Sequence, residues 1–275
     1  MATLPFVKMH GLGNDFVVLD AFEHDVRITP DLARRIGDRR FGIGCDQILV
    51  AAPSQLADAR MLIYNQDGSE VEMCGNGIRC LALYLKSRGR APGPALRVET
   101  LAGIVTPAFA GDRVRVDMGP PIWDGRAIPV DADGEVVRRS LTVDGHAVEM
   151  TCVSMGNPHS VQFVPSVATA PVHELGPKIE RHAFFPKRTN VEFVERVDPH
   201  HVRMRVWERG AGETLACGSG ACAVGAVSIR LGHARSPLTV SLPGGDLEIE
   251  WDGGAGSVFM TGPGAEVFRG EIDVP

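Results

Sequence analysis

Two cysteines in this chain begin nearly identical motifs. Cys74 begins Cys-Gly-Asn-Gly, and Cys217 begins Cys-Gly-Ser-Gly. After each motif, apolar residues recur at helical spacing until a glycine, Gly89 or Gly232, ends the pattern. We therefore expect each thiol to lie at the start of a helix, beside backbone N–H groups that have no partner within the helix.

Two thiols on opposite sides of one carbon atom suit an inversion of configuration. One thiolate removes a proton from one face while the opposite thiol delivers a proton to the other, and exchanging the roles reverses the reaction. A free thiol has a pKa of about 8.5, and a helix N-terminus lowers the pKa by roughly one unit. We therefore expect both thiols to titrate near neutral pH, with one proton shared by the pair.

The residues around the two thiols recur at a constant distance along the chain. Cys217 follows Cys74 by 143 positions, since 217 minus 74 is 143. The same offset relates Asn14 to Asn157, Gln47 to Asn190, Asn65 to Glu208, Gly89 to Gly232 and Gly119 to Gly262. Each copy has several short strand patterns and one long helix pattern, which indicates an internal duplication. The prediction is an α+β fold of two pseudo-symmetric domains, residues 1–119 completed by 264–275, and residues 120–263.

Polar residues would line the cleft between two such domains, which is the default place for a ligand. The predicted substrate-binding side chains are Asn14, Gln47, Asn65, Asn157, Asn190, Glu208 and Arg209. The helix starts at Gly75-Asn76 and Gly218-Ser219 would offer backbone N–H groups to a carboxylate. This lining favours a small zwitterion. We see no lysine in a Schiff-base setting and no phosphate-binding loop, so we expect no cofactor.

Composition excludes several other classes of function. The 275 residues carry a net charge of −6 without a basic stripe, which argues against a nucleic-acid partner. No apolar run approaches the ~20 residues that a membrane helix needs, and no signal peptide is evident, so we expect a cytoplasmic protein without a membrane partner. The six cysteines lack zinc-ligand spacing, so we expect free thiols and no metal.

Several motifs together resemble one known family. They are Lys8–Phe16 (KMHGLGNDF), Gly42–Gln47 (GIGCDQ), Met73–Cys80 (MCGNGIRC), Gly156–His159 (GNPH) and Trp207–Gly220 (WERGAGETLACGSG). This combination, which extends over nearly the whole chain, is similar to diaminopimelate epimerase. The resemblance implies a mixed or antiparallel sheet wrapped around a central helix in each half.

The resemblance also implies an activity and roles for residues. It implies a cofactor-independent interconversion of LL- and meso-2,6-diaminopimelate, a diamino-dicarboxylic acid, in lysine and peptidoglycan precursor biosynthesis. Cys74 and Cys217 would be the acid–base pair, and His159 and Glu208 would tune their pKa values. The family implies a homodimer with Phe268 at the contact.

Four other interpretations remain open at this point. A proline racemase-like enzyme would share the fold, but Asn76 stands where that type usually has histidine. A phenazine-pathway isomerase would lack the paired cysteines. A duplicated amino-acid-binding protein would have no activity to lose when Cys74 is replaced. A redox disulfide between Cys74 and Cys217 would lack the usual C-x-x-C partner.

Overall fold

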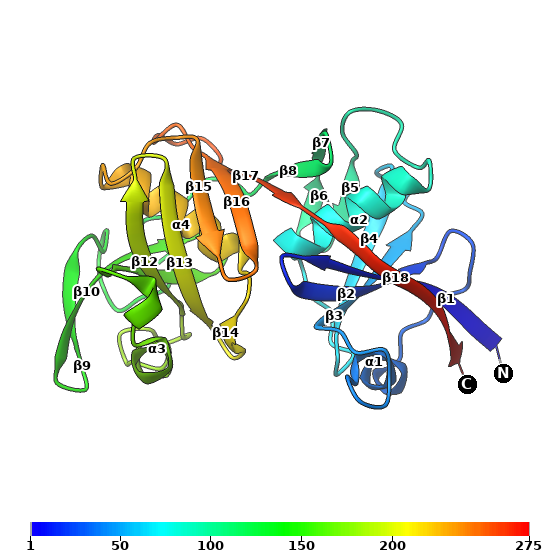
Figure 1. Ribbon diagram of the computed structural model, residues 1–275, viewed down its shortest axis with the longest axis horizontal. Coiled ribbons are helices and arrows are strands. Elements are labelled where there is room, and N and C mark those ends of the chain that lie inside the picture. Colours follow the sequence, from blue (N-terminus) through cyan, green and yellow to red (C-terminus); the bar gives the residue numbers. More distant parts are fainter. Residues whose placement is uncertain (1, 275) are drawn as a thin grey trace. The chain divides into compact units, whose positions relative to one another are not determined.

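The computed structural model describes residues 2–274 and divides the chain into two compact units (Figure 1). The first unit runs to Val116 and resumes at Thr261, and the second is Asp117–Met260. Two strands, β8 (Arg113–Asp117) and β17 (Phe259–Pro263), cross these boundaries along the chain. Each unit contains helices and a sheet, so the predicted α+β class is confirmed.

The first unit is built on a mixed sheet with the strand order β18-β1-β2-β3-β4-β5-β6. Its strands are β1 (Ala2–Gly11), β2 (Asn14–Asp20), β3 (Gln47–Ala52), β4 (Ala59–Asn65), β5 (Val98–Thr100), β6 (Gly103–Val105) and β18 (Ala265–Val274), and β7 (Ala108–Ala110) pairs with β8. Its helices are α1 (Pro30–Gly37) and α2 (Gly75–Ser87). The helix α2 packs against β1, β2 and β3.

The second unit has a mixed sheet with the order β16-β15-β13-β12-β11-β10-β9, and β14 pairs with β13. Its strands are β9 (Arg139–Val143), β10 (His146–Ser154), β11 (Pro158–Phe163), β12 (Asn190–Asp198), β13 (His201–Glu208), β14 (Gly212–Thr214), β15 (Leu238–Leu242) and β16 (Gly245–Glu250). Its helices are η1 (Val167–Thr169), α3 (Val172–Glu180) and α4 (Gly218–Arg230).

Strand register shows the duplication directly. In the first unit, Phe16 on β2 is paired with Gln47 on β3 in a parallel arrangement. In the second, His159 on β11 is paired with Asn190 on β12 in the same arrangement, and both partners are displaced by the predicted offset. The helices α2 and α4 begin and end at positions that differ by that same offset.

The helix α4 is central to its unit because the sheet surrounds it. It contacts β10, β11, β12, β13, β15 and β16, and the side chains from Gly220 to Ser228 are all buried. Small residues allow this close approach: a Cβ atom at Gly225 would lie 2.5 Å from the Cγ2 atom of Ile249. The sequence is therefore apolar all round this helix rather than along one stripe.

Across residues 2–274, no helix is both long enough and apolar enough to cross a bilayer.

Candidate functional site

Both motif cysteines occupy the residue immediately before a helix. Cys74 caps α2 and Cys217 caps α4, each with an extended backbone. The Cys74 sulfur accepts the Gly77 N–H at 3.4 Å, and the Cys217 sulfur accepts the Gly220 N–H at 3.4 Å. A capping side chain satisfies one of the free N–H groups of the first turn. The predicted position of both thiols at helix starts is confirmed.

In the first unit, the predicted site residues Asn14, Cys74 and Asn76 lie together. The Asn14 Oδ1 atom accepts the Nδ2–H of Asn76 at 3.1 Å and lies 3.9 Å from the Cys74 sulfur, which donates to it. The Asn14 Nδ2 atom donates to the Asp46 carboxylate at 2.8 Å. Asp46 therefore fixes the orientation of Asn14. This role of Asp46 was not predicted, although Asp46 belongs to the motif Gly42–Gln47.

The other two predicted amides of this unit face each other across neighbouring strands. Gln47 on β3 and Asn65 on β4 are in register, and the Gln47 Nε2 atom donates to the Asn65 Oδ1 atom at 3.1 Å. Both side chains are partly exposed. Gly75 and Asn76 form the first two positions of α2. This half therefore presents amide groups next to a helix start and a thiol.

In the second unit, topology brings the predicted residues to one end of the sheet. Asn190 begins β12 and Glu208 ends the antiparallel β13, so both lie at the same end. The Asn190 Nδ2 atom donates to the Pro158 carbonyl at 2.9 Å, and its Oδ1 atom accepts the Arg209 N–H at 2.9 Å. Glu208 accepts a short hydrogen bond from the Thr214 hydroxyl.

A buried histidine links two further residues at this end. The Nε2 atom of His159 lies 2.9 Å from the Asn157 Oδ1 atom, and its Nδ1 atom lies 2.6 Å from the Glu192 carboxylate. The side chains of His159 and Glu192 are fully buried. Glu192 was not predicted. It alternates with apolar neighbours on β12, a pattern typical of a strand with one solvent-facing side, whereas residues 190–194 are all buried.

The electrostatics around Cys217 contradict one expectation. Its exposed fraction is 5%, and burial raises the pKa of the Cys217 thiol well above its usual range, with the Glu208 and Glu192 carboxylates acting in the same direction. The Ser219 hydroxyl, 3.6 Å from the sulfur, and the Gly220 N–H oppose this shift of the pKa but do not overcome it. The prediction that Cys217 titrates near neutrality is therefore wrong for the ligand-free chain.

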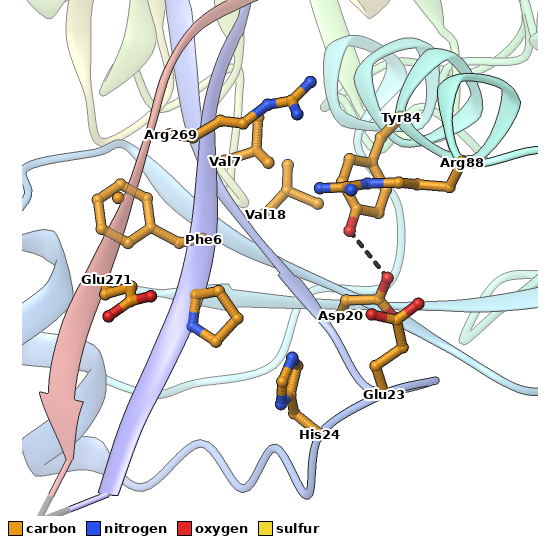
Figure 2. Close-up of a pocket in the computed structure, with 12 residues that line it drawn as sticks. Phe6, Val7, Val18, Asp20, Glu23, His24, Tyr84, Arg88, Arg269 and Glu271 are labelled. Atoms are coloured by element: carbon orange, nitrogen blue, oxygen red, sulfur yellow. Dashed lines mark hydrogen bonds between the residues drawn. The ribbon is translucent and has the colours of Figure 1, made fainter.

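The first unit also contains a cavity of about 320 Å³ that holds none of the predicted site residues (Figure 2). Its charged lining has both signs and includes Asp20, Arg88 and Arg269. The Tyr84 hydroxyl donates to the Asp20 carboxylate at 2.8 Å, and burial together with that carboxylate raises the pKa of Tyr84 to about 12. Because neither thiol nor any other predicted site residue lines it, we do not assign this cavity to the chemistry of the thiols.

Phe268 lies on the edge strand β18. It is 46% exposed, and its ring meets that of Phe6 edge-on with centroids 5.9 Å apart. Among residues 2–274, no three histidine, cysteine or acidic side chains are arranged so that they could hold a metal ion.

Comparison with known proteins identifies the family. The family model described as diaminopimelate epimerase matches residues 6–123 and 151–267. The diaminopimelate epimerase of Moorella thermoacetica is 52% identical over 274 residues, which cover 97% of this chain and 98% of that protein. The diaminopimelate epimerase of Acetivibrio thermocellus is 49% identical over 275 residues, which cover 98% of each chain.

Solved structures show that the fold is shared more widely. A Bacillus anthracis phenazine biosynthesis protein of the PhzF family superposes with a TM-score of 0.74 at 17% identity and full coverage of both chains. A hydroxyproline epimerase from Agrobacterium vitis gives 0.68 at 15% identity, covering 98% of this chain and 92% of that one. These likenesses establish the fold alone, whereas the matches along the sequence are specific. The chain is an isomerase that belongs to the diaminopimelate epimerase family.

Proposed function

We propose that the chain interconverts LL- and meso-2,6-diaminopimelate without a cofactor, with Cys74 and Cys217 as the acid–base pair. The observation that carries this proposal is the recurrence of one arrangement in both halves: a thiol caps a helix and accepts a backbone N–H from its first turn. The family supports a cytoplasmic role in lysine and peptidoglycan precursor biosynthesis.

The two thiols would enter the reaction in different protonation states. Burial raises the pKa of Cys217 and so favours its protonated form, which suits it to deliver a proton. Cys74, which is less buried, would then remove the proton from the opposite face of the same carbon. Running the reaction in reverse exchanges these roles, as microscopic reversibility requires.

The residues around the thiols would bind the substrate and stabilise the charge that develops. The N–H groups at Gly75-Asn76 and Gly218-Ser219 would hold the carboxylate next to the reacting carbon, because helix N-termini favour anions. Negative charge that spreads onto this carboxylate during deprotonation would be stabilised there. The remaining polar contacts are assigned to Asn14, Gln47, Asn65, Asn157, Asn190, Glu208 and Arg209, with His159 and Glu208 tuning the thiols.

Solvent isotope exchange tests the mechanism. In D₂O, the chain should incorporate deuterium at one α-carbon of diaminopimelate, as measured by mass spectrometry. Cys74→Ser and Cys217→Ser should each abolish epimerisation, because a serine hydroxyl is too weak an acid to serve in the pair. Serine also caps helices well, so both variants should remain folded.

Two other thiols provide matched controls. Cys80 and Cys222 are fully buried inside the same two helices. Cys80→Ala and Cys222→Ala should retain exchange. Full activity in either serine variant would rule out the two-thiol mechanism, and a wild-type chain that binds diaminopimelate without exchange would favour a binding protein.

We also propose that the chain forms a homodimer through β18. This strand lies at the edge of its sheet and exposes Val267 and Phe268, by 56% and 46%. Sedimentation velocity should show a dimer that Phe268→Glu converts to a monomer. Leu101→Glu, at a residue 50% exposed in the turn between β5 and β6, is the control and should leave the dimer intact.

A further inference from the structure

The duplicated halves differ at one buried pair of residues. The offset that relates the halves matches Phe16 with His159 and Leu49 with Glu192, and strand register places both pairs identically. All four residues have an exposed fraction of 0%. An apolar pair in the half that carries Cys74 is therefore an ionisable pair in the half that carries Cys217.

Leu49 lies against the first turn of α2, and Glu192 lies against the first turn of α4. A Cβ atom at Gly77 would lie 3.2 Å from the Leu49 Cδ2 atom and 3.5 Å from the Cys74 sulfur. A Cβ atom at Gly220 would lie 3.1 Å from the Glu192 Oε1 atom and 3.2 Å from the Cys217 sulfur. Both atoms lie close to this one point, so the Glu192 Oε1 atom and the Cys217 sulfur are no farther apart than the sum of their two distances from it.

The hydrogen bonds of His159 define how many protons the pair holds. The Asn157 Oδ1 atom can only accept, so the His159 Nε2 atom, 2.9 Å away, carries a proton. The 2.6 Å contact between the His159 Nδ1 atom and the Glu192 Oε1 atom needs one more proton. Whether this proton belongs to the ring or to the carboxyl, the His159–Glu192 pair is neutral.

Burial makes that proton necessary. The Glu192 Oε2 atom is buried without a hydrogen-bond partner among the described residues, and a lone buried carboxylate is costly. Burial raises the pKa of Glu192, while His159 opposes this shift. The other titratable groups that interact electrostatically with Glu192 are Glu208 on β13, Cys152 on β10 and Cys217 before α4.

We propose that Glu192 is a positioning residue that fixes His159 and, with it, keeps one proton beside Cys217, so that Cys217 can ionise next to a neutral pair. The importance of this for turnover rests on the proposed function. In the half that carries Cys74, the equivalent positions hold Phe16 and Leu49, whose side chains cannot hold a proton.

Two single variants should affect the thiolate of Cys217 differently. Glu192→Gln replaces one neutral pair by another, so the alkylation of Cys217 with iodoacetamide should keep the pH profile of the wild-type chain. His159→Phe leaves the carboxyl without its partner, so alkylation should require a higher pH. Peptide mass spectrometry of the full-length chain follows Cys217 separately from the other thiols.

A double variant and a matched control separate this effect from damage to the fold. His159→Phe with Glu192→Leu recreates the pair that the first half already packs and leaves no carboxyl without a partner, so its alkylation profile should return to that of the wild-type chain. Glu195→Gln removes a carboxylate from the same strand that pairs with Arg203, and it should leave the profile of Cys217 unchanged.

The outcomes distinguish this inference from the proposed function. Alkylation needs no turnover, so the shift in pH is measurable even if diaminopimelate is not the substrate. A shift in Glu192→Gln, no shift in His159→Phe, or an equal shift in Glu195→Gln would overturn the role of Glu192. A shift in His159→Phe that the double variant reverses, with a silent control, would establish it.

Discussion

Cys74 and Cys217 each satisfy a backbone N–H of the helix that follows, and this contact gives the thiols a structural role besides a chemical one. The two roles can be separated because the same N–H could donate to a better acceptor than sulfur. Sulfur is a weak hydrogen-bond acceptor, whereas serine is among the preferred residues at this position.

At Cys217, we predict that the choice of replacement separates stability from chemistry. Cys217→Ser should be more stable than Cys217→Ala by about 1 kcal/mol, because only serine retains the contact with the Gly220 N–H at the helix start. Both variants should lack epimerase activity. Urea unfolding at pH 7 measures the difference, and equal stability of the two variants would show that the cap contributes nothing.

Residues with a recognisable local context could be predicted from sequence, and residues whose role comes from pairing could not. The thiols and the motif amides stand in glycine-rich turns that repeat along the chain. Glu192 gives no such signal, because its partner His159 lies on another strand. The raised pKa of Cys217 was missed for the same reason: it depends on burial and on the carboxylates of Glu192 and Glu208.

Helices α2 and α4 carry equivalent thiols but are packed to different degrees. The helix α2 packs against β1, β2 and β3, whereas α4 contacts β10, β11, β12, β13, β15 and β16. Gly220 and Gly225 allow β12 and β16 to approach α4 closely. Sequence periodicity predicted the start of both helices. It could not predict how completely the sheet surrounds α4, because short apolar residues are compatible with either a partly or a fully covered helix.

We predict that Gly225→Ala destabilises the second unit although alanine favours helices. The gain in helix propensity is about 1 kcal/mol, whereas the new methyl group would lie 2.5 Å from Ile249 in a closed core, and overpacking costs typically 1–3 kcal/mol. Gly93→Ala, where the added atom meets nothing within 4 Å, is the control. A more stable Gly225→Ala variant, measured by urea unfolding, would contradict this account.

Across the whole molecule, buried thiols link stability to alkaline pH. Burial raises the pKa of Cys45 to about 11 and those of Cys80 and Cys152 to about 12, and it raises that of Cys217 as well. Each folded-state pKa is higher than the unfolded value. The stabilising contribution is therefore complete below about pH 8.5 and is lost as the pH rises above it.

We accordingly predict that the free energy of unfolding falls as the pH is raised from 8 to 10 under reducing conditions. Each of these thiols should contribute a slope approaching about 1.4 kcal/mol per pH unit once the unfolded thiol ionises. Cys80→Ala should remove one thiol's share of the slope. Urea titrations at several pH values measure the slope, and a flat profile for the wild-type chain would refute the linkage.

The duplication and the α+β class were predictable from the whole chain because a constant offset survives where individual residues diverge. The strand register now shows why it survives, since Phe16 with Gln47 and His159 with Asn190 hold equivalent positions. The short strand β9 was not predicted, because its exposed residues lack a clear alternation. Its partner β10 ends at Ser154, one offset after the end of β1 at Gly11, and pairs with β11 as β1 pairs with β2.

The pairing of β18 with β1 sets an order of events during translation. These two strands lie side by side in one sheet, yet the entire second unit separates them along the chain (Figure 1). A ribosome therefore exposes all of the second unit before it releases the strand that completes the first sheet. Until then β1 has an open edge, so a nascent chain that stalls before Ala265 would depend on chaperones to shield that edge.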